Sequence, residues 1–463
     1  MVDKGRKSAV RTAFVCQQCG HASPRWLGQC PGCQAWNTLV EEALPDARPR
    51  SSHAATRPAA ADGPRPLASV TAGDAIRRST GLAELDRVLG GGLVAGSLVL
   101  LGGDPGIGKS TLTLQALSNL AAQGQPVLYV AGEESPEQVR LRADRLGLAD
   151  AGVLILPETG AEAVVEQMER LRPVAVVIDS IQTLHTAALG SAPGSVGQVR
   201  ESAALVATQA KASGTACILI GHVTKEGSLA GPRVLEHLVD TVCYFEGDGA
   251  HALRVLRAVK NRFGSTNEVG VFEMGEGGLS EVQNPSAAFL AERPVDAPGS
   301  AVLATLEGTR PMLVEIQALV SRSGLAMPRR TAIGLDPGRV ALLIAVLEKR
   351  MRVQLHDQDV FLNVAGGLRV DEPAADLAVV AAVASSARGR PLPSDVVVWG
   401  EVGLTGEVRS AARAEIRVRE AARQGFRTCI LPAGNARGLA APAGTRLRGV
   451  AALDQLFDAL ELA

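Results

Sequence analysis

Short apolar runs alternate with amphipathic segments through the middle of the chain. The runs occupy residues 98–103, 127–132, 153–157, 174–180 and 216–223. Segments with helical periodicity, such as residues 135–147, lie between the first four of them. Alternation of β-like and helical segments at this spacing is typical of βαβ units. The pattern therefore predicts an α/β domain built on a mostly parallel sheet.

Three later apolar runs follow one another without helical segments between them. They occupy residues 241–247, 252–261 and 269–275. We expect them to form antiparallel strands at one edge of the sheet. A loop-like stretch near residues 285–298 then leads into a third block at residues 299–463, where further strands alternate with helices.

The same pattern divides the chain into parts. Residues 1–40 contain a cluster of cysteines, and residues 41–75 are rich in Pro, Ala, Arg and Ser without the period of a strand or a helix. We interpret this second stretch as a flexible linker. The α/β domain is expected over residues 76–285, and an α+β domain is expected over residues 299–463.

Composition indicates a folded protein without a global charge signature. Of the 463 residues, 46% are hydrophobic and only 3% are aromatic, and the formal net charge is −1. The cores must therefore be built from Val, Leu, Ile and Ala. Any contact with nucleic acid must use local patches of positive charge.

The sequence also indicates where the protein works. No apolar run reaches the roughly 18 residues of a membrane helix. The basic N-terminus lacks the apolar segment of a secretion signal. Three isolated cysteines, Cys217, Cys243 and Cys429, lie inside apolar runs and are expected to be small buried core residues. These features predict a cytoplasmic protein that does not enter a membrane.

Four cysteines near the N-terminus form two C-x-x-C pairs. Cys16 and Cys19 are followed, after ten residues, by Cys30 and Cys33. Each pair offers two thiolates on one side of a turn, and two such pairs complete a tetrahedral sulfur shell for Zn²⁺. Because all four ligands come from the protein, we expect a structural zinc finger. A redox dithiol is the weaker alternative.

Three side chains beside these cysteines have two interpretations. Trp26, Trp36 and the neighbouring Arg25 are suited to contact nucleic acid or a protein partner. They are equally suited to form the small core of the finger itself. The sequence alone does not separate these interpretations.

A phosphate-binding loop follows the first apolar run of the α/β domain. Residues 103–111, GDPGIGKST, fit the pattern G-x-x-x-x-G-K-[ST] between a strand and a helix. Backbone N–H groups at the helix N-terminus bind phosphates, Lys109 neutralises the β- and γ-oxygens, and Ser110 ligates Mg²⁺. The predicted nucleotide-binding residues are Gly103, Asp104, Pro105, Gly106, Ile107, Gly108, Lys109, Ser110 and Thr111.

Polar residues at the ends of three other apolar runs suit nucleotide hydrolysis. Asp179 is predicted to hold Mg²⁺ together with Ser110. Glu133 is favoured as the base that activates water, with Glu134 as a supporting acid. The alternative for both glutamates is the exposed first turn of a helix, where acids are common. His222 is a candidate γ-phosphate sensor, although a single histidine more often has a structural role.

The order of these motifs resembles the bacterial RadA family, also called Sms, of the RecA superfamily. The resemblance rests on the four-cysteine finger followed by GGGLVAGSLVLLGGDPGIGKSTL, VAGEES, VVIDSIQT, GHVTKEG and AVKNRFG. It implies a RecA-like P-loop ATPase that uses ATP, Mg²⁺ and Zn²⁺, binds single-stranded and branched DNA, and forms hexameric rings. It further implies branch migration in recombinational repair, with a RecA-type recombinase or replication proteins as partners.

The resemblance also implies where DNA is bound. RecA-type proteins hold DNA in two loops, which correspond by position to residues 185–198 and 225–233. Lys225 and Arg233 are the expected phosphate contacts. Simple exposure to solvent is the alternative for both loops.

The KNRFG run at residues 260–264 resembles a signature of the same family. In RecA-like rings and filaments, cations from the neighbouring subunit reach the γ-phosphate. The resemblance therefore implies that Lys260 and Arg262 are catalytic residues acting across subunits. The alternative is a cationic sheet edge that binds DNA or stays solvated.

Two C-terminal stretches, GGLRVDEPAADLAVVAA and GEVGLTGEVRSAARAEIRVREA, resemble the Lon protease domain, which uses a Ser–Lys dyad. Ala374 stands at the serine position, and Glu415 is expected at the lysine position. A serine hydrolase needs a nucleophile and a base within hydrogen-bond reach. We therefore expect a fold without protease activity that serves ring assembly and DNA contact. The basic residues available for that contact are Arg329, Arg330, Lys349, Arg350 and Arg352, although a solvated helix face explains the last three equally well.

Three functions follow from these observations. The first is a DNA-dependent ATPase motor. The second is an ATP-gated scaffold that loads partner proteins on DNA without moving along it. The third is an ATP-dependent protease, which the missing dyad disfavours. The sequence does not separate the first two.

Overall fold

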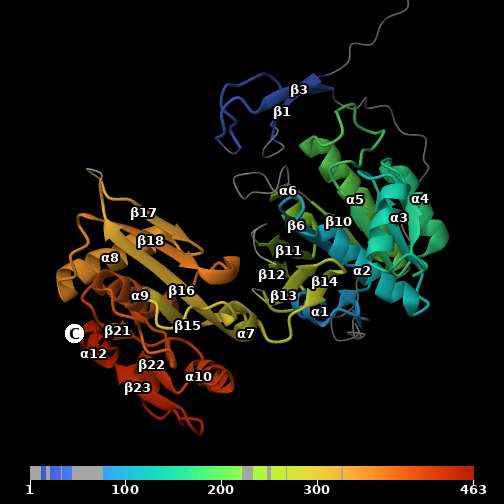
Figure 1. Cartoon of the computed structure of the whole chain (residues 1–463). Coiled ribbons are helices and arrows are strands. Elements are labelled where there is room, and N and C mark those ends of the chain that lie inside the picture. Colours follow the sequence, from blue (N-terminus) through green and yellow to red (C-terminus); the bar gives the residue numbers. More distant parts are fainter. Residues whose placement is uncertain are drawn as a thin grey trace, which may run out of the picture. The chain divides into compact units, whose positions relative to one another are not determined.

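A computed structural model describes residues 12–16, 21–32, 34–43, 77–221, 233–247, 252–266, 268–324 and 327–462. The chain divides into two compact units (Figure 1). The first consists of Met1–Phe245 and Leu256–Glu281, and the second of Glu246–Val255 and Val282–Ala463. Within the described residues, no helix is both long enough and apolar enough to cross a bilayer.

The N-terminal cysteine segment forms a small antiparallel sheet with the strand order β2-β1-β3. Its strands are β1 (Thr12–Cys16), β2 (Ala22–Ser23) and β3 (Leu39–Ala43). We call residues 12–43 the ribbon. The chain between β2 and β3 carries Cys30 on a tight turn, in which the Gln34 N–H donates to the Cys30 carbonyl at 2.8 Å.

A nine-stranded sheet forms the centre of the first unit, with the order β14-β13-β12-β11-β6-β10-β9-β7-β8. The strands are β6 (Leu98–Gly103), β7 (Val127–Ala131), β8 (Leu154–Leu156), β9 (Ala175–Asp179), β10 (Ala216–Ile220), β11 (Thr241–Glu246), β12 (Leu253–Asn261), β13 (Val269–Gly275) and β14 (Gly278–Glu281). The six strands from β11 to β8 are all parallel to one another. The α/β fold with a mostly parallel sheet is therefore confirmed.

The direction of β11 differs from the expected antiparallel edge. Thr241 lies opposite Val99, and Phe245 lies opposite Gly103, so β11 runs parallel to β6. The helix α6 (Arg233–Leu238) precedes β11, and the chain then enters β11 beside the amino end of β6. Six residues are too few to show helical periodicity, which is why the sequence pattern did not reveal this connection. An antiparallel pair does occur further out, between β13 and β14.

Helices cover both faces of this sheet. They are α1 (Ala83–Leu89), α2 (Lys109–Ala122), α3 (Pro136–Arg145), α4 (Ala161–Leu171) and α5 (Val196–Ser213). Residues of α1, α2 and α3 pack with Val99 and Leu101 on one face. Residues of α4, α5 and α6 pack with Leu98 and Leu100 on the other. The strands are apolar on both sides because two helical layers bury them.

The second unit contains a seven-stranded sheet with the order β17-β18-β16-β15-β19-β22-β23. Its strands are β15 (Ser300–Glu307), β16 (Arg310–Arg322), β17 (Arg330–Ile333), β18 (Gln358–Val364), β19 (Val396–Val398), β22 (Thr428–Pro432) and β23 (Arg446–Val450). Its helices are α7 (Pro285–Leu290), α8 (Pro337–Met351), α9 (Asp376–Arg388), α10 (Ala414–Arg423), α11 (Ala433–Ala436) and α12 (Leu453–Ala459). β16 is antiparallel to both its neighbours, whereas β15, β19, β22 and β23 are mutually parallel. This mixed sheet with separate helices is the expected α+β domain.

The three isolated cysteines are buried, as expected, and burial raises the pKa of the Cys217, Cys243 and Cys429 thiols to about 12. The thiolate is the reactive form. We therefore expect iodoacetamide at neutral pH to leave all three unmodified in the native protein, as measured by mass spectrometry of peptides. Unfolding in urea should make them reactive and serves as the control. Rapid native modification of any of them would contradict this packing.

Candidate functional site

The phosphate-binding loop joins the carboxyl end of β6 to the N-terminus of α2. Gly103 has a φ of 154° and Gly108 a φ of 114°, values that L side chains rarely adopt. A Cβ on Gly103 would lie 2.6 Å from the Phe245 carbonyl oxygen, and one on Gly108 would lie 2.6 Å from the Met274 Cε. The loop backbone therefore lies directly against β11 and β13. Residues 104–106 remain exposed at its tip.

Lys109 begins α2 and is only 4% exposed. Its Nζ donates to the carbonyl oxygens of Gly103 at 2.8 Å and Asp104 at 2.9 Å. Burial lowers the pKa of Lys109, and the nearby carboxylates of Asp179 and Glu133 oppose that shift. Its hydrogen bonds go to loop carbonyls, which phosphate oxygens can replace. Ser110 and Thr111, the next residues of α2, are half-buried.

Asp179 ends β9 and is held by a residue that the sequence analysis missed. The hydroxyl of Tyr129 in β7 donates to Asp179 Oδ2 at 2.5 Å, and both side chains are buried. Burial and the adjacent Asp179 raise the pKa of Tyr129 well above its usual value. The hydroxyl thus remains a donor at physiological pH and orients the carboxylate. The available signal was a single tyrosine inside the otherwise aliphatic strand VLYVA.

The two glutamates that follow β7 have different partners. Glu133 accepts a hydrogen bond from the hydroxyl of Ser180, the residue after Asp179. Glu134 instead forms an ion pair with Arg142 of α3. Glu133 therefore lies beside Asp179 and Lys109, whereas the bonds of Glu134 hold it to the next helix. Of the two glutamates, Glu133 is therefore the one whose charge acts on Lys109.

The side chains at this edge of the sheet fit a nucleotide with its Mg²⁺. They combine a glycine-rich loop, a buried lysine, a serine hydroxyl and an oriented carboxylate, which are the groups that phosphates and a hard cation prefer. Ser110 and Asp179 would hold the metal, and Lys109 would contact the phosphates. His222, the candidate γ-phosphate sensor, lies outside the described residues.

The predicted DNA loops are described only in part. Lys225 lies outside the described residues, and Arg233 begins α6 without a described side chain. The first loop, residues 185–198, is anchored by Gln198, which is 2% exposed. The Gln198 Nε2 donates to the carbonyl oxygens of Leu189 at 3.1 Å and Ser191 at 3.0 Å. These bonds hold the loop onto the start of α5.

The KNRFG run lies beside the amino end of β6, whereas the phosphate-binding loop follows the carboxyl end of the same strand. The Arg262 Nη1 contacts Asp240 Oδ1 at 3.0 Å, and Asp240 Oδ2 accepts a hydrogen bond from the Leu98 N–H at 3.0 Å. Leu98 starts β6, and the loop begins where β6 ends. Lys260 donates to two backbone carbonyls at the end of α6. The Arg262 side chain is 54% exposed, so it faces solvent beyond its ion pair.

The ribbon presents two of its four predicted zinc ligands within the described residues. Cys16 and Cys30 are both buried. The Gly32 N–H donates to the Cys30 Sγ at 3.3 Å, a bond that stabilises negative charge on sulfur. These features fit a thiolate zinc site. Cys19 and Cys33 lie outside the described residues, and the described part of the chain alone brings together no cluster of three or more metal-binding side chains.

The structure describes the surroundings of Glu415, the residue expected at the position of the protease lysine. Glu415 is exposed and pairs with Arg419 on the surface of α10. Arg417, two residues further along α10, contacts the segment before Ala374. It is 1% exposed, and its Nη2 contacts Glu372 Oε2 at 2.5 Å. A guanidinium stays protonated and cannot act as a base.

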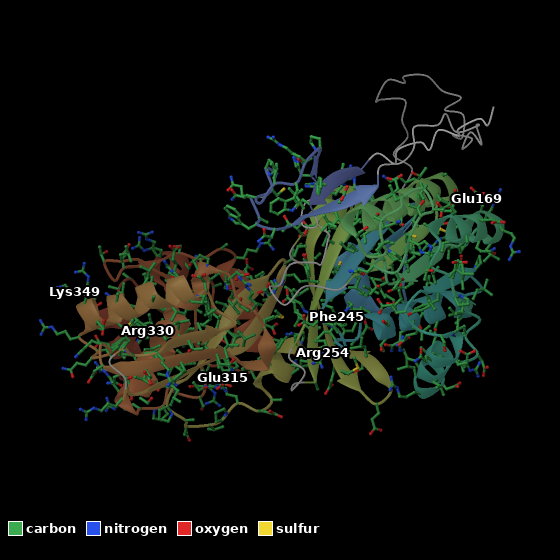
Figure 2. The ribbon with its side chains drawn as sticks, turned by 90° about the horizontal axis from the view of Figure 1, so that it is seen from above. Glu169, Phe245, Arg254, Glu315, Arg330 and Lys349 are labelled. Carbon is green, nitrogen blue, oxygen red and sulfur yellow. The ribbon has the colours of Figure 1, made fainter. Side chains whose placement is uncertain are left out.

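The basic residues proposed for DNA contact in the second unit all face solvent. The exposed side chains are Arg329, Arg330, Lys349, Arg350 and Arg352. Figure 2 shows Lys349 at the outer surface of this unit. Their exposure is equally consistent with DNA contact and with a solvated face.

Models of three protein families match the chain. A rubredoxin metal binding domain matches residues 14–41, and an AAA domain matches residues 64–228. A Lon protease (S16) C-terminal proteolytic domain matches residues 345–448. The three matches follow the order of the ribbon, the nucleotide site and the second unit.

Relatives match over nearly the full length. DNA repair protein RadA of Bacillus subtilis is 53% identical over 447 residues, covering 96% of this chain and 97% of that protein. DNA repair protein RadA of Pseudomonas aeruginosa is 55% identical over 454 residues, covering 97% and 99%. A solved KaiC-like protein of Pyrococcus horikoshii is 22% identical, and the match covers 45% of this chain and 99% of that protein. Its TM-score of 0.39 is too low to add to the fold assignment.

The different partners of the two glutamates lead to a test. Glu133→Gln should slow ATP hydrolysis by about 10²–10⁴-fold, the usual contribution of a positioned base. ATP binding should remain, because the phosphate contacts come from the loop and Lys109. Glu134→Gln is the matched control and should affect hydrolysis far less. Phosphate release and ATP titration measure the two effects, and a larger loss of hydrolysis in Glu134→Gln would reverse the assignment.

Proposed function

The chain belongs to the DNA repair protein RadA family, and on that basis we propose that it is a DNA-dependent ATPase of recombinational repair. In this proposal it forms a ring, binds single-stranded and branched DNA, and promotes branch migration. The observation that carries the proposal is the grouping of Lys109, Asp179 and Glu133 at one edge of the parallel sheet. That grouping supports hydrolysis rather than binding alone.

Each residue of this group has a separate task in the proposed reaction. Lys109 exchanges its two carbonyl partners for phosphate oxygens. Ser110 and Asp179 hold Mg²⁺, which when bound neutralises charge on the phosphates. Tyr129 is a positioning residue that keeps the Asp179 carboxylate in one orientation. Glu133 orients the attacking water and accepts its proton.

The cations of KNRFG complete the proposed site from a neighbouring subunit. Asp240 ties Arg262 to the start of β6, so Arg262 does not reach the phosphates bound at the end of that strand in its own subunit. Its exposed side chain supports contact with another copy. Lys260 is held by the end of α6 and would position the run or act beside Arg262. Both would stabilise charge that develops during phosphoryl transfer.

DNA is proposed to bind at the two loops that follow β9 and β10. Gln198 in the first turn of α5 fixes the position of residues 185–198. This loop follows β9, the strand that ends in Asp179, so the structure connects it to the nucleotide site. Lys225 and Arg233 remain the proposed phosphate contacts. The basic residues of the second unit are proposed as further contacts.

The second unit is proposed to be inactive as a protease. The residues at the two expected dyad positions, Ala374 and Glu415, support this because neither supplies a serine nucleophile or a lysine base. The proposed roles of this unit are ring assembly and DNA contact. The scaffold alternative remains open, since a loading ring would use the same nucleotide site.

The experiment that tests this function compares ATP hydrolysis with single-stranded, double-stranded and forked DNA, together with branch migration of a labelled junction. We expect DNA to stimulate hydrolysis and migration to require hydrolysable ATP. Lys109→Ala should abolish both and serves as the control for a contaminating ATPase. Full migration with an ATP analogue that cannot be hydrolysed would refute the motor and favour the scaffold. Absence of any DNA effect would refute the DNA-dependent function.

A further inference from the structure

The ribbon exposes its two tryptophans, although the chain has few aromatic side chains. The sequence contains 3 Trp, 2 Tyr and 8 Phe. Trp26 is 54% exposed and Trp36 is 69% exposed, whereas Trp399 is fully buried. Across the described ranges, these two are the only aromatic side chains classed as exposed. Large apolar rings left in water are costly, so their position calls for an explanation.

Among the described residues of the ribbon, the small core does not include these rings. It consists of Cys16, Cys30 and Leu39, with Phe14 and Leu27 packed against them. Of the two interpretations that the sequence left open, a core role for Trp26 and Trp36 is therefore wrong. The remaining interpretation is contact with a ligand or a partner.

The two indoles border the same point on the ribbon. A Cβ on Gly28 would lie 3.8 Å from Cη2 of Trp26 and 3.7 Å from Cζ3 of Trp36. Trp36 pairs with Gln29 across an antiparallel bridge, and the Asn37 N–H donates to the Gly28 carbonyl at 2.8 Å. The backbone thus brings both rings to Gly28, which adds no side chain between them. Paired rings on a fixed backbone form a surface on which a flat group can stack.

The N-terminal segment also differs in charge from the rest of the protein. Residues 1–43, which end with the ribbon, contain five cations against the three acids Asp3, Glu41 and Glu42, a net charge of +2, while the whole chain has a formal net charge of −1. The five cations are Lys4, Arg6, Lys7, Arg11 and Arg25. Arg25 is exposed next to Trp26. This charge is complementary to a polyanion.

Exposed aromatic rings combined with local positive charge are the chemistry that binds single-stranded nucleic acid, because unpaired bases stack on the rings and phosphates pair with the cations. In a duplex the base faces are already stacked and do not reach a flat ring. We propose that Trp26 and Trp36 form a stacking site for unpaired bases of single-stranded DNA. This inference rests on the proposed DNA-dependent function and gives the ribbon a part in it.

Tryptophan fluorescence tests the stacking directly in the full-length, zinc-loaded protein. Trp399→Phe removes the one other indole, and its Nε1 has no hydrogen-bond partner among the described residues that this change would lose. In that background, titration with oligodeoxythymidylate should quench the emission of Trp26 and Trp36. An oligonucleotide of equal length made of abasic sites carries the same phosphates without bases. It should leave the emission nearly unchanged, because only bases stack.

Substitution gives an independent measurement. The double variant Trp26→Ala, Trp36→Ala should bind oligodeoxythymidylate more weakly by at least roughly 5- to 150-fold, which is the loss expected for a single stacking ring. Its salt dependence should stay the same, since no phosphate contact is lost. Val40→Ala is the matched control, because Val40 is an apolar residue of the same ribbon that is 50% exposed. Unchanged zinc content would show that the ribbon is intact.

The outcomes separate this inference from the function on which it rests. Two results would overturn the stacking site and leave a DNA-dependent ATPase in place. In the first, oligodeoxythymidylate binds without quenching the emission. In the second, it binds the double variant as tightly as it binds the wild type. A wild-type protein that binds no DNA, and whose ATP hydrolysis ignores DNA, would overturn the proposed function itself. The quenching result needs no change in the ribbon, so it decides the matter even if the double variant loses zinc.

Discussion

The direction of the strands in the nine-stranded sheet separates the two groups of charges that the proposed ATP hydrolysis would use. Lys109, Asp179 and Glu133 gather where the parallel strands end, while Lys260 and Arg262 lie where β6 begins. β6 has 6 residues and therefore spans roughly 17 Å. Neither cation can cross that distance around a rigid sheet. A complete set of charges in this proposal therefore requires a second copy of the chain.

Burial fixes the orientation of the side chains at the carboxyl ends of the parallel strands. Lys109 and Asp179 are both nearly inaccessible to water, so their orientation depends on protein partners. Tyr129 supplies one such partner from the adjacent strand, and the loop carbonyls of Gly103 and Asp104 supply the others. Charges held in this way need little rearrangement when a nucleotide replaces their partners, which favours catalysis.

Sequence patterns predicted the parts of the fold that depend on local repetition. The hydrophobic periods of strands and helices predicted the parallel core, and the spacing of glycines predicted the phosphate-binding loop with Lys109. The patterns did not predict features that depend on contacts between distant segments. Tyr129 looks like any core residue of an aliphatic strand until Asp179 lies beside it. The ion pair between Arg417 of α10 and Glu372 likewise joins two segments that no spacing rule connects.

The tryptophans of the ribbon show the same limit. Their exposure depends on a core that Cys16, Cys30 and Leu39 fill on their own, which no spacing rule reveals. In the same way, α6 was too short to be seen as a period, and it reversed the expected direction of β11.

Co-expression of Lys109→Ala with Arg262→Ala subunits tests most directly whether the site is completed by a neighbour. Each variant alone should hydrolyse ATP poorly, since one lacks the phosphate lysine and the other the proposed cation in trans. Mixed rings should recover up to about a quarter of the wild-type rate, because some interfaces pair the intact loop of one subunit with the intact Arg262 of the next. Full hydrolysis by Arg262→Ala alone, or no recovery in rings shown to contain both subunits, would contradict a site shared between copies.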